Sequence, residues 1–166
     1  MAAFPTKQTA FERALPCETD TNEVGAVLGR TLTSGDTVLL SGEMGAGKSH
    51  LARALIRTRL AQPDMAVPSP TYTLVNVYAD PSDSVEIWHA DLYRLGETDE
   101  LAEIGLEDAV QHAIVLVEWP ERWGAPPPRH LAVTMQATET HDHAITITPV
   151  GPGWEKVMTA LEALPT

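Results

Sequence analysis

The sequence predicts an α/β fold built as a single domain over residues 1–166, with a mostly parallel central sheet flanked by helices and an antiparallel edge hairpin. Two observations predict this class. The runs TVLL (37–40) and IVLVE (114–118) are continuously apolar, which is typical of strands covered on both faces. Segments with apolar residues at helical spacing lie between and around these runs, as expected when helices pack against such a sheet.

The first half of the chain is predicted as helix, strand, loop and helix. Residues 19–32 begin with capping residues, continue with apolar positions at helical spacing, and end in the turn Ser34-Gly35-Asp36. After the strand at 37–40 comes a glycine-rich loop. The segment KSHLARALIRTRL (48–60) follows, and its apolar residues fall on one face of a helix.

The second half mixes strands with less regular segments. Alternating apolar residues predict strands at 72–79 and 84–91, joined by turn residues at 80–83. Residues 96–112 are polar, acidic and typical of a broken helix. After the strand at 114–118, the pattern predicts a hairpin from residues 131–138 and 144–150 around the tip ETHDH, and a closing amphipathic helix at 154–164.

Composition and charge restrict the class of protein. Hydrophobic residues make up 43% and charged residues 20%, which is typical of a soluble globular chain and argues against disorder. The formal net charge of −12 would repel nucleic-acid phosphates, so we expect only indirect involvement of nucleic acid. The single cysteine, Cys17, forms no internal disulfide, and no apolar run is long enough for a membrane span or a signal peptide. These features predict a cytoplasmic protein without membrane contact.

The loop GEMGAGKS (42–49) fits the phosphate-binding pattern G-x-x-x-x-G-K-[ST] in full. Its glycines let the backbone curve around a phosphate, so that successive N–H groups point at the anionic oxygens. Lys48 adds a positive charge, the Ser49 hydroxyl is a ligand for Mg²⁺, and the following helix points its positive end at the phosphates. The pattern predicts a P-loop NTPase in which the nucleotide contacts Glu43, Met44, Gly45, Ala46, Gly47, Lys48, Ser49 and His50.

A P-loop enzyme needs an acid that holds Mg²⁺, usually at the end of a neighbouring apolar strand. Glu118 ends IVLVE and fits this role, which makes Ser49 and Glu118 the predicted magnesium ligands. Asp91 ends SVEIWHAD and is the second candidate acid. We expect Trp119 either to stack on a base or a partner or to pack in the core. For Arg94 the alternatives are a cation that senses phosphate and a surface salt bridge.

Several nucleotide-binding classes fit poorly. A GTPase reads guanine through N-K-x-D, which does not occur in the chain. A small-molecule kinase usually closes an arginine-rich lid over its substrates, whereas Arg94, Arg122 and Arg129 are scattered. The chain is also too short for the extra domains of a motor. A minimal nucleotide switch or an ATPase remains.

Five segments in one order extend this interpretation: GEMGAGKS, SPTYTLV (69–75), HADLYRL (89–95), EIGLED (103–108) and VEWPER (117–122). Over residues 12–150 the chain resembles the TsaE family, the bacterial ATPases needed for threonylcarbamoyladenosine modification of tRNA. The resemblance implies a P-loop fold that binds ATP and Mg²⁺, hydrolyses ATP slowly alone, and associates with the TsaD and TsaB proteins.

The resemblance also implies roles for residues at matching positions. Lys48 and Ser49 would hold phosphate and magnesium, and Thr71 would lie in a switch-like segment near the γ-phosphate. The functional acids would be Asp91 and Glu118, with Trp119 and Arg94 beside them. The chain departs from the family pattern at Ser49 and His50, where threonine is common, and at Glu43-Met44, where Asp-Leu is common. None of these changes removes a group that the chemistry requires, and residues after about 150 match no motif.

Three functions therefore follow from the sequence. The main hypothesis is a Mg²⁺-dependent ATPase that supports tRNA modification together with TsaD and TsaB, without itself holding tRNA. A nucleotide-dependent interaction switch with little turnover is the first alternative. A small-molecule P-loop kinase is the second.

Overall fold

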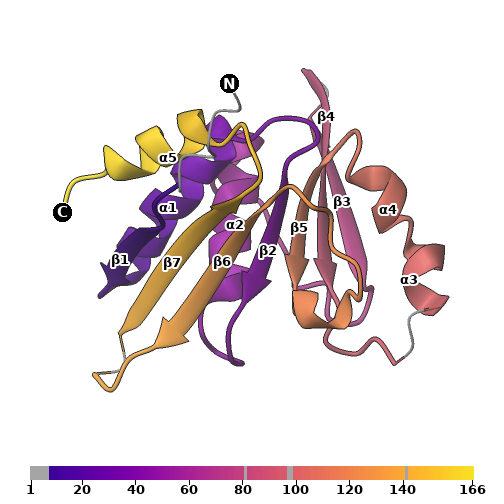
Figure 1. Ribbon diagram of the computed structural model, residues 1–166, viewed down its shortest axis with the longest axis horizontal. Coiled ribbons are helices and arrows are strands. Elements are labelled where there is room, and N and C mark those ends of the chain that lie inside the picture. Colours follow the sequence, from indigo (N-terminus) through magenta and orange to yellow (C-terminus); the bar gives the residue numbers. More distant parts are fainter. Residues whose placement is uncertain (1–7, 81, 97–98, 141) are drawn as a thin grey trace, which may run out of the picture.

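A computed structural model describes residues 8–166 apart from 81, 97–98 and 141, and these residues form one seven-stranded sheet with helices on both faces (Figure 1). The strands are β1 (Phe11–Leu15), β2 (Thr37–Ser41), β3 (Val75–Asp80), β4 (Asp83–Asp91), β5 (Ile114–Glu118), β6 (His130–Ala137) and β7 (His143–Val150). The helices are α1 (Glu18–Thr31), α2 (Lys48–Arg59), α3 (Asp99–Ile104), α4 (Leu106–Ala109), the 3₁₀ turn η1 (Pro120–Arg122) and α5 (Glu155–Glu162).

The strand order is β1-β7-β6-β2-β5-β4-β3. The four central strands β6, β2, β5 and β4 are parallel, and antiparallel pairs extend the sheet at both edges. The predicted α/β class, with a parallel core and an antiparallel edge hairpin, is confirmed. β1 is an additional strand that sequence analysis did not predict, and it pairs with the outer side of β7.

The central strands divide the core into two apolar layers. Val38 and Leu40 of β2 pack into the layer under α1, α2 and α5, whereas Leu39 packs into the layer next to α4. β5 alternates in the same way, and all five of its residues are buried. Such a strand is apolar on both faces, which explains why its sequence pattern is continuous.

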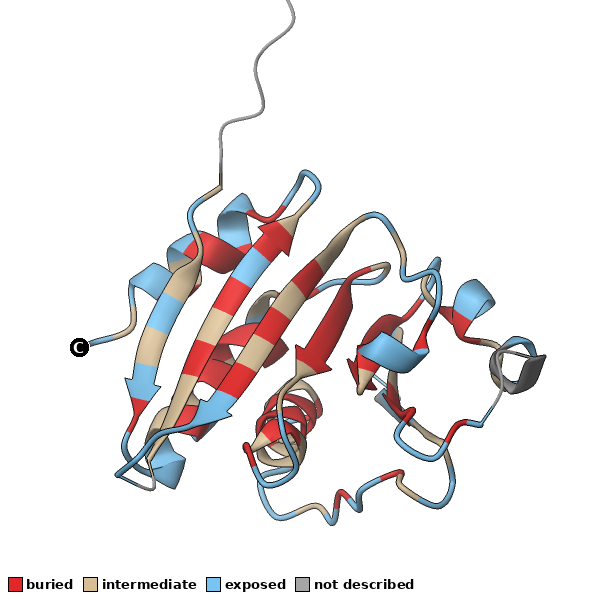
Figure 2. Cartoon of the chain, turned by 60° about the horizontal axis from the view of Figure 1, so that its bottom comes forward, coloured by how far each residue is buried: buried red, intermediate tan, exposed pale blue. Residues whose placement is uncertain are grey.

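The sheet is covered on one face only at the β6–β7 side. Leu131, Val133 and Met135 of β6 are buried against the helices, whereas Thr134 is half-buried and Gln136 is exposed on the opposite face. The same alternation continues across β7 and is visible as bands of colour along both strands (Figure 2). The alternating sequence patterns at 131–138 and 144–150 have this cause.

Most boundaries differ from the sequence prediction by one or two residues, and the start of β3 differs by three. The predicted strand at 72–79 begins only at Val75, because Leu74 has a positive φ of 66° and its N–H bonds to the Pro70 carbonyl in a turn. The predicted broken helix is α3 followed by α4, and the break is at Gly105, whose φ is 83°. No helix of the described residues is long and apolar enough to cross a membrane.

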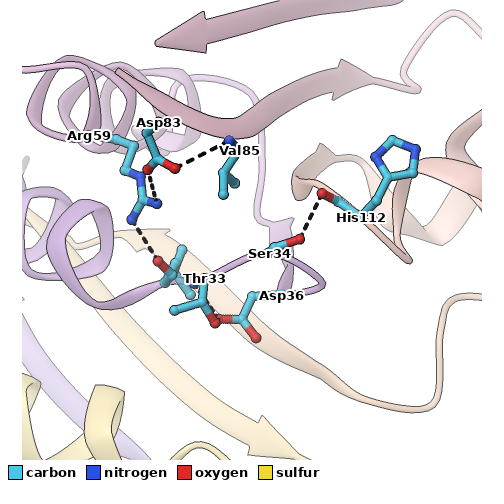
Figure 3. A network of polar contacts seen from close by, with 8 residues as sticks. Thr33, Ser34, Asp36, Arg59, Asp83, Val85 and His112 are labelled. Carbon is cyan, nitrogen blue, oxygen red and sulfur yellow. Dashed lines mark hydrogen bonds and ion pairs between the residues drawn. The ribbon is translucent and has the colours of Figure 1, made fainter. Parts of the chain in front are cut away.

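Polar contacts fix the amino-terminal edge of the parallel strands (Figure 3). Arg59, at the end of α2, donates to the Leu32 carbonyl at 2.8 Å and to the Asp83 carboxylate at 2.7 Å. Ser34 donates to the His112 carbonyl, which joins the loops before β2 and β5. These contacts leave the opposite, carboxyl-terminal edge as the place where loops are open for binding.

Helices α1 and α2 approach closely at two glycines of α1. A Cβ built on Gly25 would lie 2.6 Å from the Ala54 Cβ, and one built on Gly29 would lie 2.6 Å from the Leu55 carbonyl oxygen. Both distances are shorter than a van der Waals contact. The glycines are therefore required by packing, although glycine disfavours an isolated helix.

We predict that Gly29→Ala lowers the free energy of unfolding by about 1–3 kcal/mol, because the new methyl group overlaps backbone and separates α1 from α2. This sign is opposite to the gain of about 1 kcal/mol that helix propensity alone gives. Denaturant unfolding measures the difference. Gly124→Ala is the control, since a Cβ there meets nothing within 4 Å. A Gly29→Ala variant as stable as the wild type would contradict the close packing.

Candidate functional site

The glycine loop between β2 and α2 is shaped by two positions that only glycine occupies without strain. A Cβ on Gly42 would overlap the Met135 carbonyl oxygen of β6, so the loop lies directly against the neighbouring strand. Gly47 has a φ of 100° and caps α2. The loop then turns into the helix at Lys48, and the Ala46 N–H donates to the Glu43 carbonyl within it, so the loop curves tightly, as a phosphate-binding loop does.

Lys48 lies inside this loop and is 6% exposed. Its Nζ donates to the carbonyls of Gly42 and Glu43 and lies 4.2 Å from the centre of the Trp119 ring. Burial lowers the pKa of Lys48, against the opposing effect of the acidic side chains of Glu118, Glu121 and Asp91. The ammonium group is therefore partly stripped of water, which strengthens its attraction for an anion.

The two strand-end acids lie side by side, because Asp91 of β4 is the register partner of Glu118 of β5. Glu118 is 2% exposed and accepts a hydrogen bond from the Ser49 hydroxyl at 2.8 Å. Asp91 is 4% exposed and accepts from the Thr71 hydroxyl at 3.0 Å and from the Tyr93 N–H at 2.9 Å. Neither acid is a solvated strand end or a helix cap.

Glu118 is held in its charged form. Burial acts to raise its pKa, but the neighbouring His89, the Ser49 hydroxyl and the Lys48 charge together bring the pKa below its ordinary value. A carboxylate and a hydroxyl 2.8 Å apart are hard oxygen donors of the kind that Mg²⁺ prefers. Ser49 and Glu118 therefore fit the predicted magnesium site.

The segment before β3 closes one side of the site. Ser69 and Thr71 share a hydrogen bond between their hydroxyls at 2.7 Å, and Thr71 continues this chain to Asp91. Tyr72 is 81% exposed and carries the Arg94 guanidinium 4.4 Å above its ring. Thr71 is thus fixed toward the acids while its neighbour Tyr72 faces outward.

These groups surround one pocket of about 440 Å³. Its lining consists of Met44, Gly45, Gly47, Lys48, Ser49, His50, Ser69, Thr71, Asp91, Tyr93, Arg94, Glu118 and Trp119. Of the residues predicted from the sequence, only Glu43 and Ala46 do not line it, since the Glu43 carbonyl contacts Lys48 from behind and Ala46 is buried. A larger hollow of about 520 Å³ lies between α1 and α2, but it holds neither acid and meets the pocket only at His50.

Sequence reasoning missed three of the contributing residues. Ser69 lies within SPTYTLV and Tyr93 within HADLYRL. Sequence analysis singled out both segments but assigned no role to these two residues. His143 was expected in the hairpin tip ETHDH; it is the first residue of β7, and its Nε2 lies 3.2 Å from the Gly45 carbonyl oxygen of the glycine loop. No local pattern predicts this contact between residues 98 positions apart. The adjacent position 141 lies outside the described residues.

A glycine loop between a buried parallel strand and a helix, with Lys48 and Ser49 at the helix start and Glu118 on the next strand, defines the class of P-loop proteins. Residues 15–145 match the family described as threonylcarbamoyl adenosine biosynthesis protein TsaE. The chain belongs to the TsaE family.

Individual relatives agree with this assignment. The chain is 34% identical over 135 residues to the "tRNA threonylcarbamoyladenosine biosynthesis protein TsaE" of Nostoc, which covers 78% of this chain and 80% of that protein. It is 35% identical over 107 residues to the protein of the same name from Rickettsia conorii, and this match spans 64% of the chain and 59% of the Rickettsia protein. The fold is similar to that of the solved structure of YdiB from Bacillus subtilis, with a TM-score of 0.76, 20% identity, and coverage of 93% and 95% of the two chains.

We predict that Glu118→Gln weakens the loss of stability in acid. Because the pKa of folded Glu118 lies below the ordinary value of 4.5, its ionised form stabilises the folded protein above that pH, and the contribution is lost as pH falls through the lowered value. The free energy of unfolding should therefore fall more steeply for the wild type than for the variant between pH roughly 5 and 3. Denaturant unfolding at each pH measures it, with the exposed Glu155→Gln as control. Parallel curves for wild type and Glu118→Gln would refute the lowered pKa.

Proposed function

We propose that this protein is a Mg²⁺-dependent ATPase that supports threonylcarbamoyladenosine modification of tRNA together with the TsaD and TsaB proteins. One observation carries the proposal. Lys48, Ser49, Thr71, Asp91 and Glu118 come from four separate segments and converge on one pocket behind a complete phosphate-binding loop. Membership of the TsaE family supports the assignment to this pathway.

The binding step follows from the contacts of Lys48. Its Nζ donates to neutral carbonyls of its own loop, and phosphate oxygens are stronger, charged acceptors at the same place. The loop N–H groups and the start of α2 add their partial positive charge. Trp119, Arg94 and Tyr93 also line the pocket, and in this proposal they contact the base and ribose of the nucleotide.

The chemical step is hydrolysis with water as the acceptor. Ser49 and Glu118 would hold Mg²⁺, which would supply positive charge to the phosphates. Thr71 and Asp91 orient the attacking water. A bond forms between the water oxygen and the γ-phosphorus, the bond from the γ-phosphorus to the β-phosphate oxygen breaks, the proton lost by the water passes to a γ-phosphate oxygen, and ADP and inorganic phosphate leave. Lys48 stabilises the charge on the group in transfer.

The partners follow from the family and from charge. With a net charge of −12, this chain is a poor surface for tRNA, so TsaD and TsaB contact the tRNA and this protein acts on them in the cytoplasm. In this proposal ATP hydrolysis sustains their cycle, and the threonylcarbamoyl group never enters the pocket of this chain.

A nucleotide-dependent interaction switch with little turnover is a second candidate, and exposed apolar side chains favour it. Met44 is 71% exposed, Tyr93 is 40% exposed, and both line the pocket, while Tyr72 stands beside it under Arg94. Such side chains at the mouth of a nucleotide site fit a surface that a partner covers. Glu118→Gln discriminates the two functions: full support of modification without hydrolysis would favour the switch.

We predict that Lys48→Ala lowers ATP affinity and turnover by roughly a hundredfold or more, since it removes the charge that stabilises the transferring phosphoryl group. The measurement is binding and hydrolysis of ATP and of GTP, by the protein alone and with purified TsaD and TsaB. Lys156→Ala, an exposed lysine of α5, is the matched control and should behave as wild type. Unchanged turnover in Lys48→Ala would rule out the assignment, and transfer of label to a metabolite would support the kinase alternative.

A further inference from the structure

His89 is a buried imidazole beneath the acids of the pocket. It lies on β4, is 1% exposed, and faces the same side of the sheet as Asp91, two positions further along the strand. Its neighbours on this face are Ile87 and, by register, Leu116, both 0% exposed. The position belongs to the apolar layer under α2, where an aliphatic residue would be expected.

Neither ring nitrogen of His89 has a hydrogen-bond partner among the described residues. Burying an imidazole without partners costs free energy, and buried polar side chains in proteins are usually satisfied. An aliphatic side chain would fill the same space without this cost. The imidazole is therefore present for something other than packing.

The Glu118 carboxylate faces the His89 ring. His89 Nε2 lies 3.6 Å from Glu118 Oε1, slightly beyond hydrogen-bond distance. Since the facing atom is a carboxylate oxygen, which accepts, we assign the ring proton to Nε2. The same Oε1 already accepts the Ser49 hydroxyl at 2.8 Å. Ser49 of α2 and His89 of β4 thus both face Glu118 Oε1, and only Ser49 is within hydrogen-bond distance of it.

We propose that His89 is a positioning residue whose Nε2–H helps to hold the Glu118 carboxylate in its metal-binding orientation. A hydroxyl has one proton and two lone pairs, so Ser49 can donate to Glu118 and still present a lone pair to magnesium. That single donor leaves the carboxylate free to turn about its bond, and His89 Nε2 is a second buried donor beside the same Oε1, from which a small movement closes the 3.6 Å separation. Carboxylates that bind metals are commonly held by such hydrogen bonds.

This inference rests on the proposed function, because it assigns His89 a role toward the magnesium site. His89 and Asp91 both belong to the segment HADLYRL, but they have different roles. Asp91 lines the pocket and holds Thr71, whereas His89 lies outside the pocket lining and acts only through Glu118.

The test compares three variants of the full chain by the affinity of a fluorescent ATP analogue, measured in EDTA and over a series of Mg²⁺ concentrations. His89→Leu removes the donor and keeps an apolar side chain of similar size. His89→Gln retains an N–H donor near the position of Nε2. Ile87→Val is the control, since it changes packing on the same face of β4 without facing the acid.

We expect His89→Leu to raise the Mg²⁺ concentration for half-maximal effect by about tenfold or more, with affinity in EDTA within about twofold of wild type. His89→Gln should restore most of the response, and Ile87→Val should match wild type. Thermal unfolding with and without Mg²⁺ gives an independent measure, because bound ligand stabilises the folded state in proportion to its affinity. Should the leucine variant fail to fold, His89→Asn takes its place, since its shorter amide does not reach Oε1.

Two results would overturn the inference while leaving the proposed function intact. A wild-type Mg²⁺ response in His89→Leu would show that Glu118 needs no second donor. Equal losses in His89→Leu and His89→Gln would show that ring shape matters and the N–H does not. A wild-type protein whose nucleotide binding ignores Mg²⁺ would instead remove the proposed function, and the role of His89 with it.

Discussion

The parallel register of β2, β5 and β4 is the constraint on which the site depends. It sets Leu40 opposite Glu118 and Glu118 opposite Asp91, so the two acids lie on one face, directly under the start of α2. A slip of one residue in either pair would turn an acid to the other face of the sheet. The buried alternation of β5 fixes this register, because Leu116 and Val117 belong to different apolar layers. Core packing therefore determines which groups face the phosphate-binding loop.

The site concentrates buried charge that a fold selected for stability alone would avoid. Lys48, Asp91 and Glu118 are each less than 10% exposed. Desolvation of these groups is costly, and their mutual attraction, with hydrogen bonds from Ser49 and Thr71, offsets it. Removing one partner leaves the others buried and unbalanced. Buried polar groups of this kind, including the imidazole of His89, which makes no hydrogen bond to the described residues, are typical of a functional site held in place by a stable sheet.

Sequence patterns predicted what depends on neighbouring residues and missed what depends on tertiary contact. The strand at 114–118 and the loop at 42–49 were predicted with their boundaries, because burial on both faces and phosphate binding each impose a local pattern. β1 was missed: FERAL is a short edge strand with mixed polarity, and only its pairing with β7 makes it a strand. The contact of His143 with Gly45 was missed for the same reason, since it exists only after β7 has joined the sheet. The roles of the pocket residues stay predictions.

The site is thus supported from both sides by elements that lie far from the loop in sequence. On one side, Met135 of β6 contacts the loop at Gly42 and His143 of β7 contacts it at Gly45. On the other side, β4 and β5 carry the two acids. A loop rich in glycine loses much conformational freedom when it is ordered, so it needs such support to present its N–H groups in one arrangement. That support comes from strands on both sides of the loop, so the shape of the loop depends on the pairing of β6 and β7 as well as on that of β4 and β5. The ordering of the loop and the assembly of these strands are therefore coupled.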